Sequence, residues 1–283
     1  MKLMKMTGGL GNQMFIYAFY LQMRKRYSDT YIDISEISDK YEHNGFELDR
    51  IFEIEARYIH WPIWLKKTAK FLLFKEIDER RENLKTTNIF KYNHIWPFIY
   101  YKGFYQSEYC FKGAESEVRR AFSFKMEKAN DYSRQMALKI QKDPHAVSFH
   151  VRRGDYLKPK FYKRFGSVCQ LSYYQKAAQK ILEIDPQAHF YIFSDDTAWV
   201  TENLKLTKFT IINGNKGKDS WQDMMLMSMC RLHVISNSTF SWWGAYLDAK
   251  KDKTVIAPNK WFGDCEMPYI LPDTWTKIST END

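Results

Sequence analysis

The feature that most constrains the fold is a regular alternation of apolar strands and amphipathic helices from residue 144 onward. The pattern predicts strands at 146–152, 189–194, 209–213, 232–236 and 254–257. Between them it predicts helices at about 172–184, 196–204, 220–231 and 241–249. Capping boxes that begin at Ser172 and Ser220 would open the first and third of these helices. Strands and helices that alternate at this spacing form right-handed βαβ units on a parallel sheet, so the second half of the chain predicts an α/β domain.

The first half of the chain opens in the same way and then loses its regularity. A strand is predicted at 2–6, an amphipathic helix at 13–27 and strands at 30–34 and within 98–105, followed by helices at 114–122 and 131–142. A chain of 283 residues is also longer than most single domains. We therefore expect two domains, 1–143 and 144–283, that face each other across a cleft.

The turn between the first strand and the first helix is rich in glycine. It matches the dinucleotide-binding fingerprint poorly, because Met14 stands where the third glycine belongs. Two interpretations stay open. The turn can be tight and need glycine dihedrals, or it can bring backbone close to a ligand and offer the amides of Asn12 and Gln13.

Composition limits the class of partner. Lys and Arg number 43 against 34 Asp and Glu, and the net charge of +9 favours anionic ligands. No basic stripe with interleaved aromatics appears, which disfavours nucleic acid. Four scattered cysteines, the lack of an apolar signal region and the lack of a long apolar run predict a cytoplasmic protein. Residues 61–74 fit a helix packed on its own domain, which we favour, or one in peripheral contact with the inner membrane surface.

The strand at 146–152 ends in an unusual group of charged side chains. Arg152 and Arg153 are consecutive, and a sheet core has no use for them because unpaired buried charge is costly. They fit a clamp for an anion, most often phosphate. An ion pair between Arg153 and Asp155 that stabilises the turn is the alternative, but it leaves His150 and Arg152 unexplained.

Polar residues also follow two other strands. Asn237, Ser238 and Thr239 precede a helix, and hydroxyls together with free helix amides make a cradle for phosphate, whereas a plain helix cap needs only one of them. Ligands bind beyond the carboxyl ends of parallel strands, so the arginines and this cradle predict one pyrophosphate pocket. Asp195 and Asp196 fit a metal site or a helix cap, but without a D-x-D triplet or an HExxH motif a metal is disfavoured.

Five motifs together resemble those of the bacterial α-1,2-fucosyltransferases. They are Gly8–Phe15 with Tyr17–Ala18, Gly103–Tyr109, His150–Tyr156, Phe193–Asp196 and Ser236–Trp243. They occur in order between residue 6 and about residue 262, with Ile16 where glutamine is usual. Residues 36–95 carry no motif and so do not inform the choice of acceptor.

The resemblance implies a GT-B-like pair of Rossmann-type domains, the first on the acceptor side and the second binding GDP-β-L-fucose. It implies inversion at the anomeric carbon, with no metal or other cofactor. Arg152 would grip the β-phosphate, and His150 and Asp223 would contact guanine or ribose. For Asp223, membership of the capping box opened by Ser220 stays open.

The same resemblance assigns further residues to the donor and to the reaction. Ser238 and Thr239 would contact the phosphates and Asn12 would lie near the transferred sugar. We extend the donor set to Gly11, Arg153, Asn237 and Phe240. Arg152 and the amides at 238–240 would stabilise the leaving diphosphate. Asp155 is the candidate general base, with an ion pair to Arg152 or Arg153 as its other role.

The implied activity is transfer of L-fucose to the 2-hydroxyl of a terminal β-galactoside, carried by an oligosaccharide or a glycolipid. Two alternatives are kept. One is a metal-independent glycosyltransferase that uses another nucleotide sugar, and the other is a non-catalytic protein that binds a nucleotide or a sugar.

Overall fold

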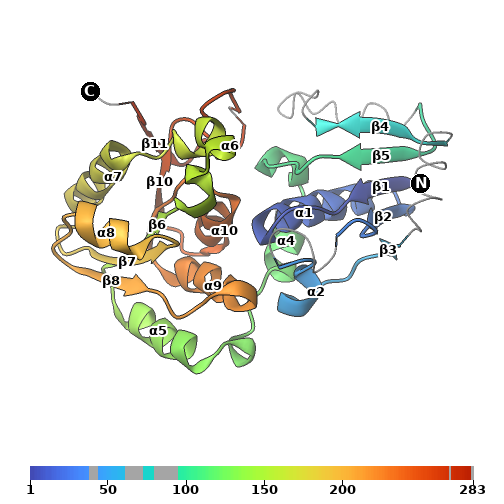
Figure 1. The fold of residues 1–283 in the computed structure, drawn as a ribbon. Helices are drawn as coiled ribbons and strands as arrows, with labels where there is room; N and C mark the ends of the chain where they lie inside the picture. The colour runs from blue at the N-terminus through green and yellow to red at the C-terminus, as the bar shows by residue number, and fades with distance from the viewer. Residues whose placement is uncertain (38–43, 61–72, 80–94, 268, 282–283) are drawn as a thin grey trace. The chain divides into compact units, whose positions relative to one another are not determined.

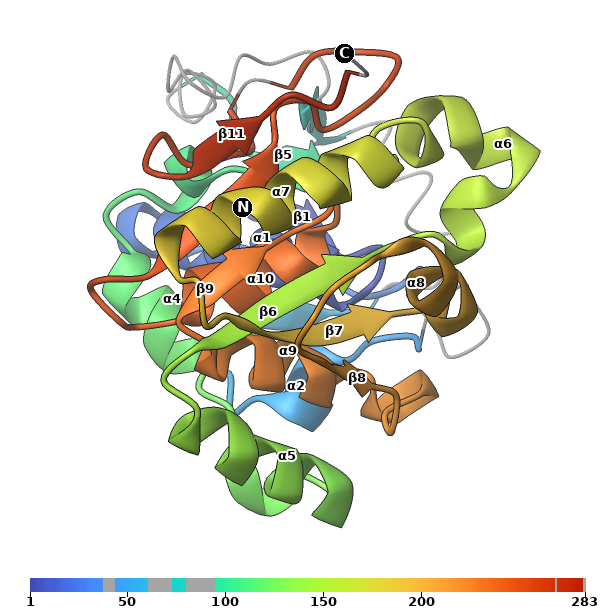
Figure 2. The same cartoon turned by 90° about the vertical axis from the view of Figure 1, so that its left-hand side faces the viewer.

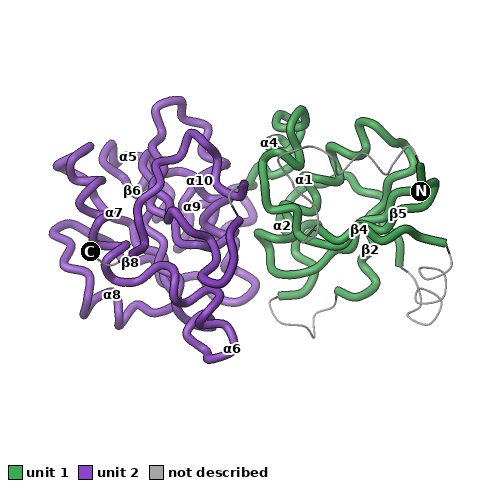
Figure 3. Tube along the Cα trace, turned by 90° about the horizontal axis from the view of Figure 1, so that it is seen from above, with its two compact units in different colours: residues 1–125 green, residues 126–283 purple. Residues whose placement is uncertain are grey.

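The computed structural model describes residues 1–37, 44–60, 73–79, 95–267 and 269–281. The chain divides into two compact units, Met1–Lys125 and Met126–Asp283 (Figure 3). The division falls earlier than the predicted boundary at 143/144, because the helix at Asp131–Lys142 belongs to the second unit. Just before this helix, Asn130 donates from its backbone nitrogen to Gln222 at 2.8 Å and from its side chain to Asn215 at 3.0 Å.

The first unit is built on a five-stranded sheet in the order β3-β2-β1-β5-β4, with every pair of neighbours parallel. Its elements are β1 (Lys2–Lys5), α1 (Leu10–Arg26), β2 (Thr30–Asp33), α2 (Leu48–Ile51), β3 (Tyr58–Ile59), β4 (Lys75–Asp78), β5 (Ile99–Lys102) and α4 (Glu115–Ala121). α1 packs against β2, α2 and α4 (Figure 1). It is buried without a break from Gln13 to Tyr20, so the helix is confirmed but it is not amphipathic.

α1 begins at Leu10, three residues before the predicted start, with Gly9 as its N-cap. The backbone amides of Asn12 and Gln13 donate to the Gly9 carbonyl at 2.9 and 3.0 Å. The hypothesis that these amides face a ligand is therefore wrong, because the first turn of the helix already satisfies them. The tight-turn interpretation is confirmed at Gly8, whose φ of +80° favours glycine.

The second unit contains a six-stranded parallel sheet in the order β11-β10-β9-β6-β7-β8. Its strands are β6 (Ala146–Val151), β7 (His189–Ser194), β8 (Phe209–Ile212), β9 (Leu232–Val234), β10 (Thr254–Pro258) and β11 (Thr276–Ile278). Its helices are α5 (Asp131–Lys142), α6 (Pro159–Phe161), α7 (Leu171–Ile184), α8 (Thr197–Asn203), α9 (Trp221–Met229) and α10 (Thr239–Leu247). Numbered from β6, the strands follow the doubly wound Rossmann order 3-2-1-4-5-6.

The two faces of this sheet are covered by different helices. α7 and α8 lie on one face and α9 and α10 on the other (Figures 1 and 2). The alternation predicted for β6 is confirmed. Its apolar residues pack into the core beneath α7 and α8, while Ser148 and His150 point to the opposite face and hydrogen-bond to His233 and Ser236.

Neither predicted capping box forms. α7 begins at Leu171 with Gln170 as its N-cap, which places Ser172 inside the first turn. Ser220 is the N-cap of α9, but its backbone is already helical (φ −57°, ψ −24°) and its side chain makes no capping hydrogen bond. A capping side chain reaches the first turn from extended backbone, so the capping role left open for Asp223 is wrong.

The predicted α/β class with two Rossmann-type units is confirmed by the two parallel sheets, whereas the GT-B-like arrangement with a cleft between the units stays a prediction. Most of the segment considered for membrane contact, residues 61–72, lies outside the described residues. In the parts of the chain that are described, no helix has both the length and the apolar character needed to cross a membrane.

Candidate functional site

The predicted site residues of the second unit lie at or just beyond the ends of three neighbouring strands, except Asp223, which lies in α9. β6 lies between β9 and β7, so the arginines after β6 stand between Ser236–Thr239 and Asp195–Asp196. β6 and β9 are adjacent in the sheet but distant in the chain. They form the topological switch point, where open α/β sheets bind their ligands. The two halves of the predicted pyrophosphate pocket therefore meet at the place that the topology favours.

Arg152 is half-buried and pairs with two carboxylates. Its Nη2 donates to Oδ1 of Asp155 at 2.6 Å, and its Nη1 lies 2.9 Å from Oδ2 of Asp195. Burial opposes the charged guanidinium, but the two carboxylates outweigh burial and hold the pKa of Arg152 above its ordinary value. Arg152 and Arg153 were both considered as ion-pair partners of Asp155, and the structure shows the pair with Arg152.

Arg153 pairs with Asp196 instead of Asp155, so the turn-stabilising pair between Arg153 and Asp155, kept as an alternative, is wrong. Its Nε donates to Oδ2 of Asp196 at 3.0 Å, and its guanidinium carbon lies 4.0 Å from the centroid of the Trp199 ring. The other oxygen of Asp196 accepts from the Trp199 amide at 3.1 Å and caps α8. The capping role considered for Asp196 is thus confirmed.

Asp195 was considered for a metal site or a helix cap, but its role as a partner of the arginines was missed. Its Oδ1 accepts from the Arg153 amide at 2.9 Å, while its Oδ2 pairs with Arg152. Gly154 leaves room for this carboxylate, because a Cβ at that position would lie only 2.6 Å from Oδ2. The signal was present, since Asp195 directly follows the strand that pairs with β6.

His150 is buried beside the arginines. Its Nδ1 lies 2.9 Å from the Ser236 hydroxyl, and burial, followed by the charge of Arg152, lowers the pKa of His150 to about 3. The ring is therefore neutral at physiological pH. Tyr156, a second missed residue, donates from its hydroxyl to the Asn237 carbonyl at 3.2 Å and ties the arginine loop to the turn before α10.

Several polar groups of the turn before α10 are hydrogen-bonded within the protein, so fewer of them are free for phosphate than the sequence predicted. The Ser238 amide donates to the Ser236 carbonyl at 2.7 Å, and the Phe240 amide donates to the Ser238 hydroxyl at 3.4 Å. The Asn237 side chain donates to the carbonyls of Phe165 and Trp261, both at 3.1 Å. The expectation of three free amides at 238–240 is therefore wrong, and Thr239 is the first residue of α10.

Asp223 lies in the first turn of α9 and belongs to a buried polar network. Its Oδ1 accepts from the Asn215 side chain at 2.8 Å, and Asn215 is in turn bound to Ser133. Burial raises the pKa of Asp223 to about 7, against a smaller lowering by the Asn215 hydrogen bond. The carboxyl group therefore changes its charge near neutral pH.

In the first unit, Asn12 also lies at a switch point, because β1 separates β2 from β5 in the sheet. Its Oδ1 accepts from the Gln106 side chain, which follows β5, at 2.7 Å. The Gln106 amide donates to the buried carboxylate of Glu79 at 3.1 Å, and burial raises the pKa of Glu79. Gln106 and Glu79 were missed. Gly11, predicted to contact the donor, is a buried residue in the first turn of α1.

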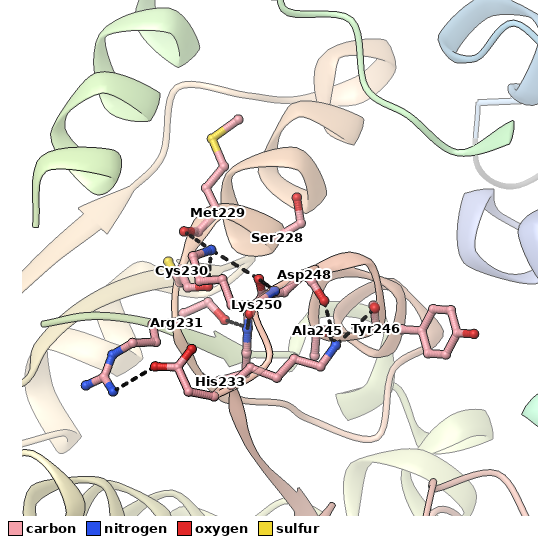
Figure 4. Close-up of polar contacts among 12 residues, drawn as sticks. Ser228, Met229, Cys230, Arg231, His233, Ala245, Tyr246, Asp248 and Lys250 are labelled. Atoms are coloured by element: carbon pink, nitrogen blue, oxygen red, sulfur yellow. Dashed lines mark hydrogen bonds and ion pairs between the residues drawn. The ribbon is translucent and has the colours of Figure 1, made fainter. Parts of the chain in front are cut away.

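A second polar cluster lies at the amino ends of the strands in the second unit (Figure 4). His233 lies 2.8 Å from the Ser148 hydroxyl and 3.1 Å from Asp248, an arrangement with the composition of a hydrolase triad. All three side chains are at most 3% exposed, so no substrate reaches them. The cluster is structural. Elsewhere in the described residues, no three His, Cys, Asp or Glu side chains gather in a way that could hold a metal ion.

The chain is similar to several glycosyltransferases. It is 26% identical to the O-antigen biosynthesis glycosyltransferase WbnK of Escherichia coli, covering 96% of this chain and 99% of the relative. It is 28% identical to an α-1,2-colitosyltransferase of E. coli, covering 97% of both. A galactoside α-(1,2)-fucosyltransferase 1 of Ateles belzebuth is 26% identical over 62% of this chain and 49% of that protein.

A protein-family comparison covers nearly the whole chain, including both units and all of the predicted site residues. The family described as glycosyl transferase family 11 matches residues 3–268, and the chain belongs to it.

Proposed function

We propose that this chain is an inverting glycosyltransferase that moves L-fucose from GDP-β-L-fucose to the 2-hydroxyl of a terminal β-galactoside. The names of two relatives, an α-1,2-colitosyltransferase and a galactoside α-(1,2)-fucosyltransferase, support the linkage. The observation that carries the proposal is the position of Arg152 at the switch point between β6 and β9, where α10 also begins. A fixed guanidinium and a helix amino terminus both favour a diphosphate there.

The chemistry explains why a cation is needed at this point. The acceptor hydroxyl attacks the anomeric carbon from the face opposite the diphosphate, and the bond from that carbon to the diphosphate oxygen breaks. Negative charge then grows on the leaving group, and preorganised donors beside it lower the barrier. Arg152 supplies the charge, which lets the reaction proceed without a metal. Ser238 and Thr239 add hydrogen bonds at the positive end of α10.

The nucleoside is assigned to His150 and Asp223 of the second unit. Nδ1 of the neutral His150 is engaged by Ser236, which leaves Nε2 for the nucleotide. Asp223 in its ionised form can accept from the adjacent N–H groups of guanine, which adenine does not offer in the same pattern. The proposed nucleotide site is completed by Arg153, Asn237 and Phe240. Arg153 contributes through its stacking on Trp199.

The sugar and the acceptor are assigned partly to the first unit. Asn12, held by Gln106, approaches the transferred sugar, with Gly11 allowing the close packing of its turn. Asp155 accepts the proton of the acceptor hydroxyl as general base. A galactoside on an oligosaccharide or a glycolipid provides that hydroxyl, and contact with the membrane surface would bring a lipid-borne acceptor to the enzyme.

The direct test is transfer from GDP-fucose to lactose with EDTA present. We expect product from the natural chain and a loss of about 10²- to 10³-fold in kcat for Arg152→Ala, the range seen when one stabilising donor is removed. Arg164→Ala is the matched control, because Arg164 is a half-exposed arginine paired with Asp264 outside the strand ends. Near-normal turnover of Arg152→Ala would exclude the phosphate role.

A second donor sugar has a specific observation in its favour. The relative that covers 97% of this chain is named a colitosyltransferase, so colitose could replace fucose on the same linkage. Transfer rates measured with the two nucleotide sugars would decide between them. Thermal-shift titration with GDP, UDP and CMP tests the nucleotide separately, and a nucleotide that binds without any sugar transfer would point to a non-catalytic binding protein.

A further inference from the structure

The charges around Arg152 do not suit a simple phosphate clamp. Arg152 and Arg153 bring two positive charges, whereas Asp155, Asp195 and Asp196 bring three negative ones. A diphosphate that approaches this cluster meets net repulsion unless one carboxylate leaves its place. The arrangement of the three carboxylates identifies which one can leave.

Asp195 and Asp196 are each fixed at both oxygens. Asp195 accepts from the Arg153 amide with one oxygen and pairs with Arg152 through the other. Asp196 accepts from the Trp199 amide with one oxygen and from Arg153 with the other. Removing either carboxylate would break a backbone hydrogen bond at a strand end or a helix start. Both carboxylates therefore hold the backbone around the arginines in place.

Asp155 is held differently. Within the part of the chain that the structure describes, Arg152 is the partner that holds its carboxylate, through one 2.6 Å hydrogen bond. Its side chain is 36% exposed and lies in the short turn Gly154–Leu157, just after the arginines. An ion pair that is partly exposed in this way contributes little stability, so another anion can replace its carboxylate at low cost.

We infer that Asp155 is an exchangeable counter-ion of Arg152, which occupies Nη2 in the free protein and is replaced there by the diphosphate of the donor. The inference rests on the proposed function, because it takes the incoming anion to be a nucleotide diphosphate. The exchange is non-covalent: one carboxylate oxygen leaves the guanidinium and one phosphate oxygen arrives. Asp195 stays in place and keeps the guanidinium oriented, which makes it a positioning residue.

The exchange links donor binding to catalysis. While Asp155 is bound to Arg152, its carboxylate is held at the guanidinium, on the side of the diphosphate and away from an acceptor hydroxyl on the opposite face of the sugar. Binding of the donor releases it, so the proposed general base becomes available only when the sugar to be transferred is present. This order protects the donor site from unproductive proton transfer and predicts opposite effects for two neighbouring carboxylates.

The experiment is calorimetric titration of the full chain with GDP at pH 7.5. Asp155→Asn removes the competing carboxylate, and we expect it to bind GDP about tenfold more tightly than the natural chain. Asp195→Asn loses the ion pair that orients Arg152, and we expect binding about tenfold weaker. In transfer assays Asp155→Asn should combine tight GDP binding with a kcat lowered at least about 10²-fold.

Asp196→Asn is the matched control. It removes the same charge from the same edge of the sheet while an asparagine can still cap α8, so a general charge effect would tighten GDP binding in it as in Asp155→Asn. Unchanged or weaker GDP binding by Asp155→Asn, or equal tightening by Asp196→Asn, would overturn the exchange. Failure of the proposed function looks different: the natural chain would not bind GDP, or Arg152→Ala would bind it equally well.

Discussion

The two edges of the sheet in the second unit carry polar clusters that are similar in composition and opposite in construction. At the amino edge Asp248, whose side chain is 1% exposed, accepts from His233 at 3.1 Å and from the Lys250 side chain at 3.1 Å. At the carboxyl edge Arg152, whose side chain is 31% exposed, is shared between Asp155 and Asp195. Both clusters join cations to carboxylates, but only the second can change partners without unfolding.

The two clusters differ because the lysines of the amino edge contact the carboxyl ends of helices (Figure 4). Lys253 donates to the carbonyls of Ala245, Tyr246 and Asp248 at the end of α10, and Lys250 donates to those of Met229 and Cys230 at the end of α9. Each lysine thereby neutralises the negative end of a helix. At the carboxyl edge the helices present their positive ends instead, so an anion is the natural partner there.

The largest effect that would test this contrast is on stability. Asp248→Ala removes the carboxylate that both His233 and Lys250 contact, and we expect the free energy of unfolding to fall by about 3–5 kcal/mol, as for other buried pairs that lose one member. Urea unfolding followed by circular dichroism measures it. Asp252→Ala is the control, because Asp252 is 69% exposed and lies 3.7 Å from Arg231. A loss below about 1 kcal/mol for Asp248→Ala would remove the distinction between the two edges.

A smaller change at the carboxyl edge should affect activity instead of stability. In Gly154→Ala the new Cβ would lie 2.6 Å from Oδ2 of Asp195 and push that carboxylate off Arg152. We expect kcat to fall about thirtyfold, which corresponds to about 2 kcal/mol for one lost charged hydrogen bond. The melting temperature should change by only a few degrees.

A double-mutant cycle shows whether this loss passes through Asp195. In an Asp195→Ala background, Gly154→Ala should have almost no further effect on kcat, because the contact that it disrupts is already gone. Additive losses in the double variant would mean that the alanine acts on the backbone of the arginine loop and not on the carboxylate.

The sequence was most informative where burial is regular. β7 spans the predicted residues because it is a continuous apolar run, and α5 spans 131–142 as predicted because its apolar residues recur with the helical period. β3 and β11 have two and three residues and carry no such pattern, so they could not be recognised. The start of α1 was missed because glycines at its first turn favour a turn interpretation over a helix.

The site was predictable in position but not in pairing. The strand ends identified Arg152, His150 and Ser238, since the carboxyl edge of a parallel sheet is the expected site. Which carboxylate pairs with which arginine depends on strand order, and Asp195 became visible only once β6 and β7 were neighbours. The capping box predicted at Ser220–Asp223 does not form, because the backbone of Ser220 is helical and its side chain cannot cap α9 from there.

Asp223 gives the finest test of the comparison, because it is a partly buried carboxylate bonded to a neutral amide, whereas Asp248 is buried and bonded to a lysine. Cations and hydrogen bonds lower the pKa of Asp248 despite burial, whereas burial raises the pKa of Asp223 to about 7. If the ionised carboxylate accepts from guanine, affinity for GDP must rise with pH as the proton leaves. We expect up to about tenfold tighter binding at pH 8 than at pH 6, levelling above that.

The Asp223→Asn variant separates this proton from those of GDP itself. Its affinity should lose the part of the pH dependence that Asp223 contributes, while the part due to the phosphates remains. The stability of the fold should change in the opposite direction. Asp223 ionises at a lower pH in the unfolded chain than in the folded one. As the pH rises from about 4 to about 7, the natural chain therefore loses stability relative to the variant. Identical pH profiles for GDP binding by the two proteins would show that Asp223 serves only its hydrogen-bond network with Asn215 and does not contact guanine.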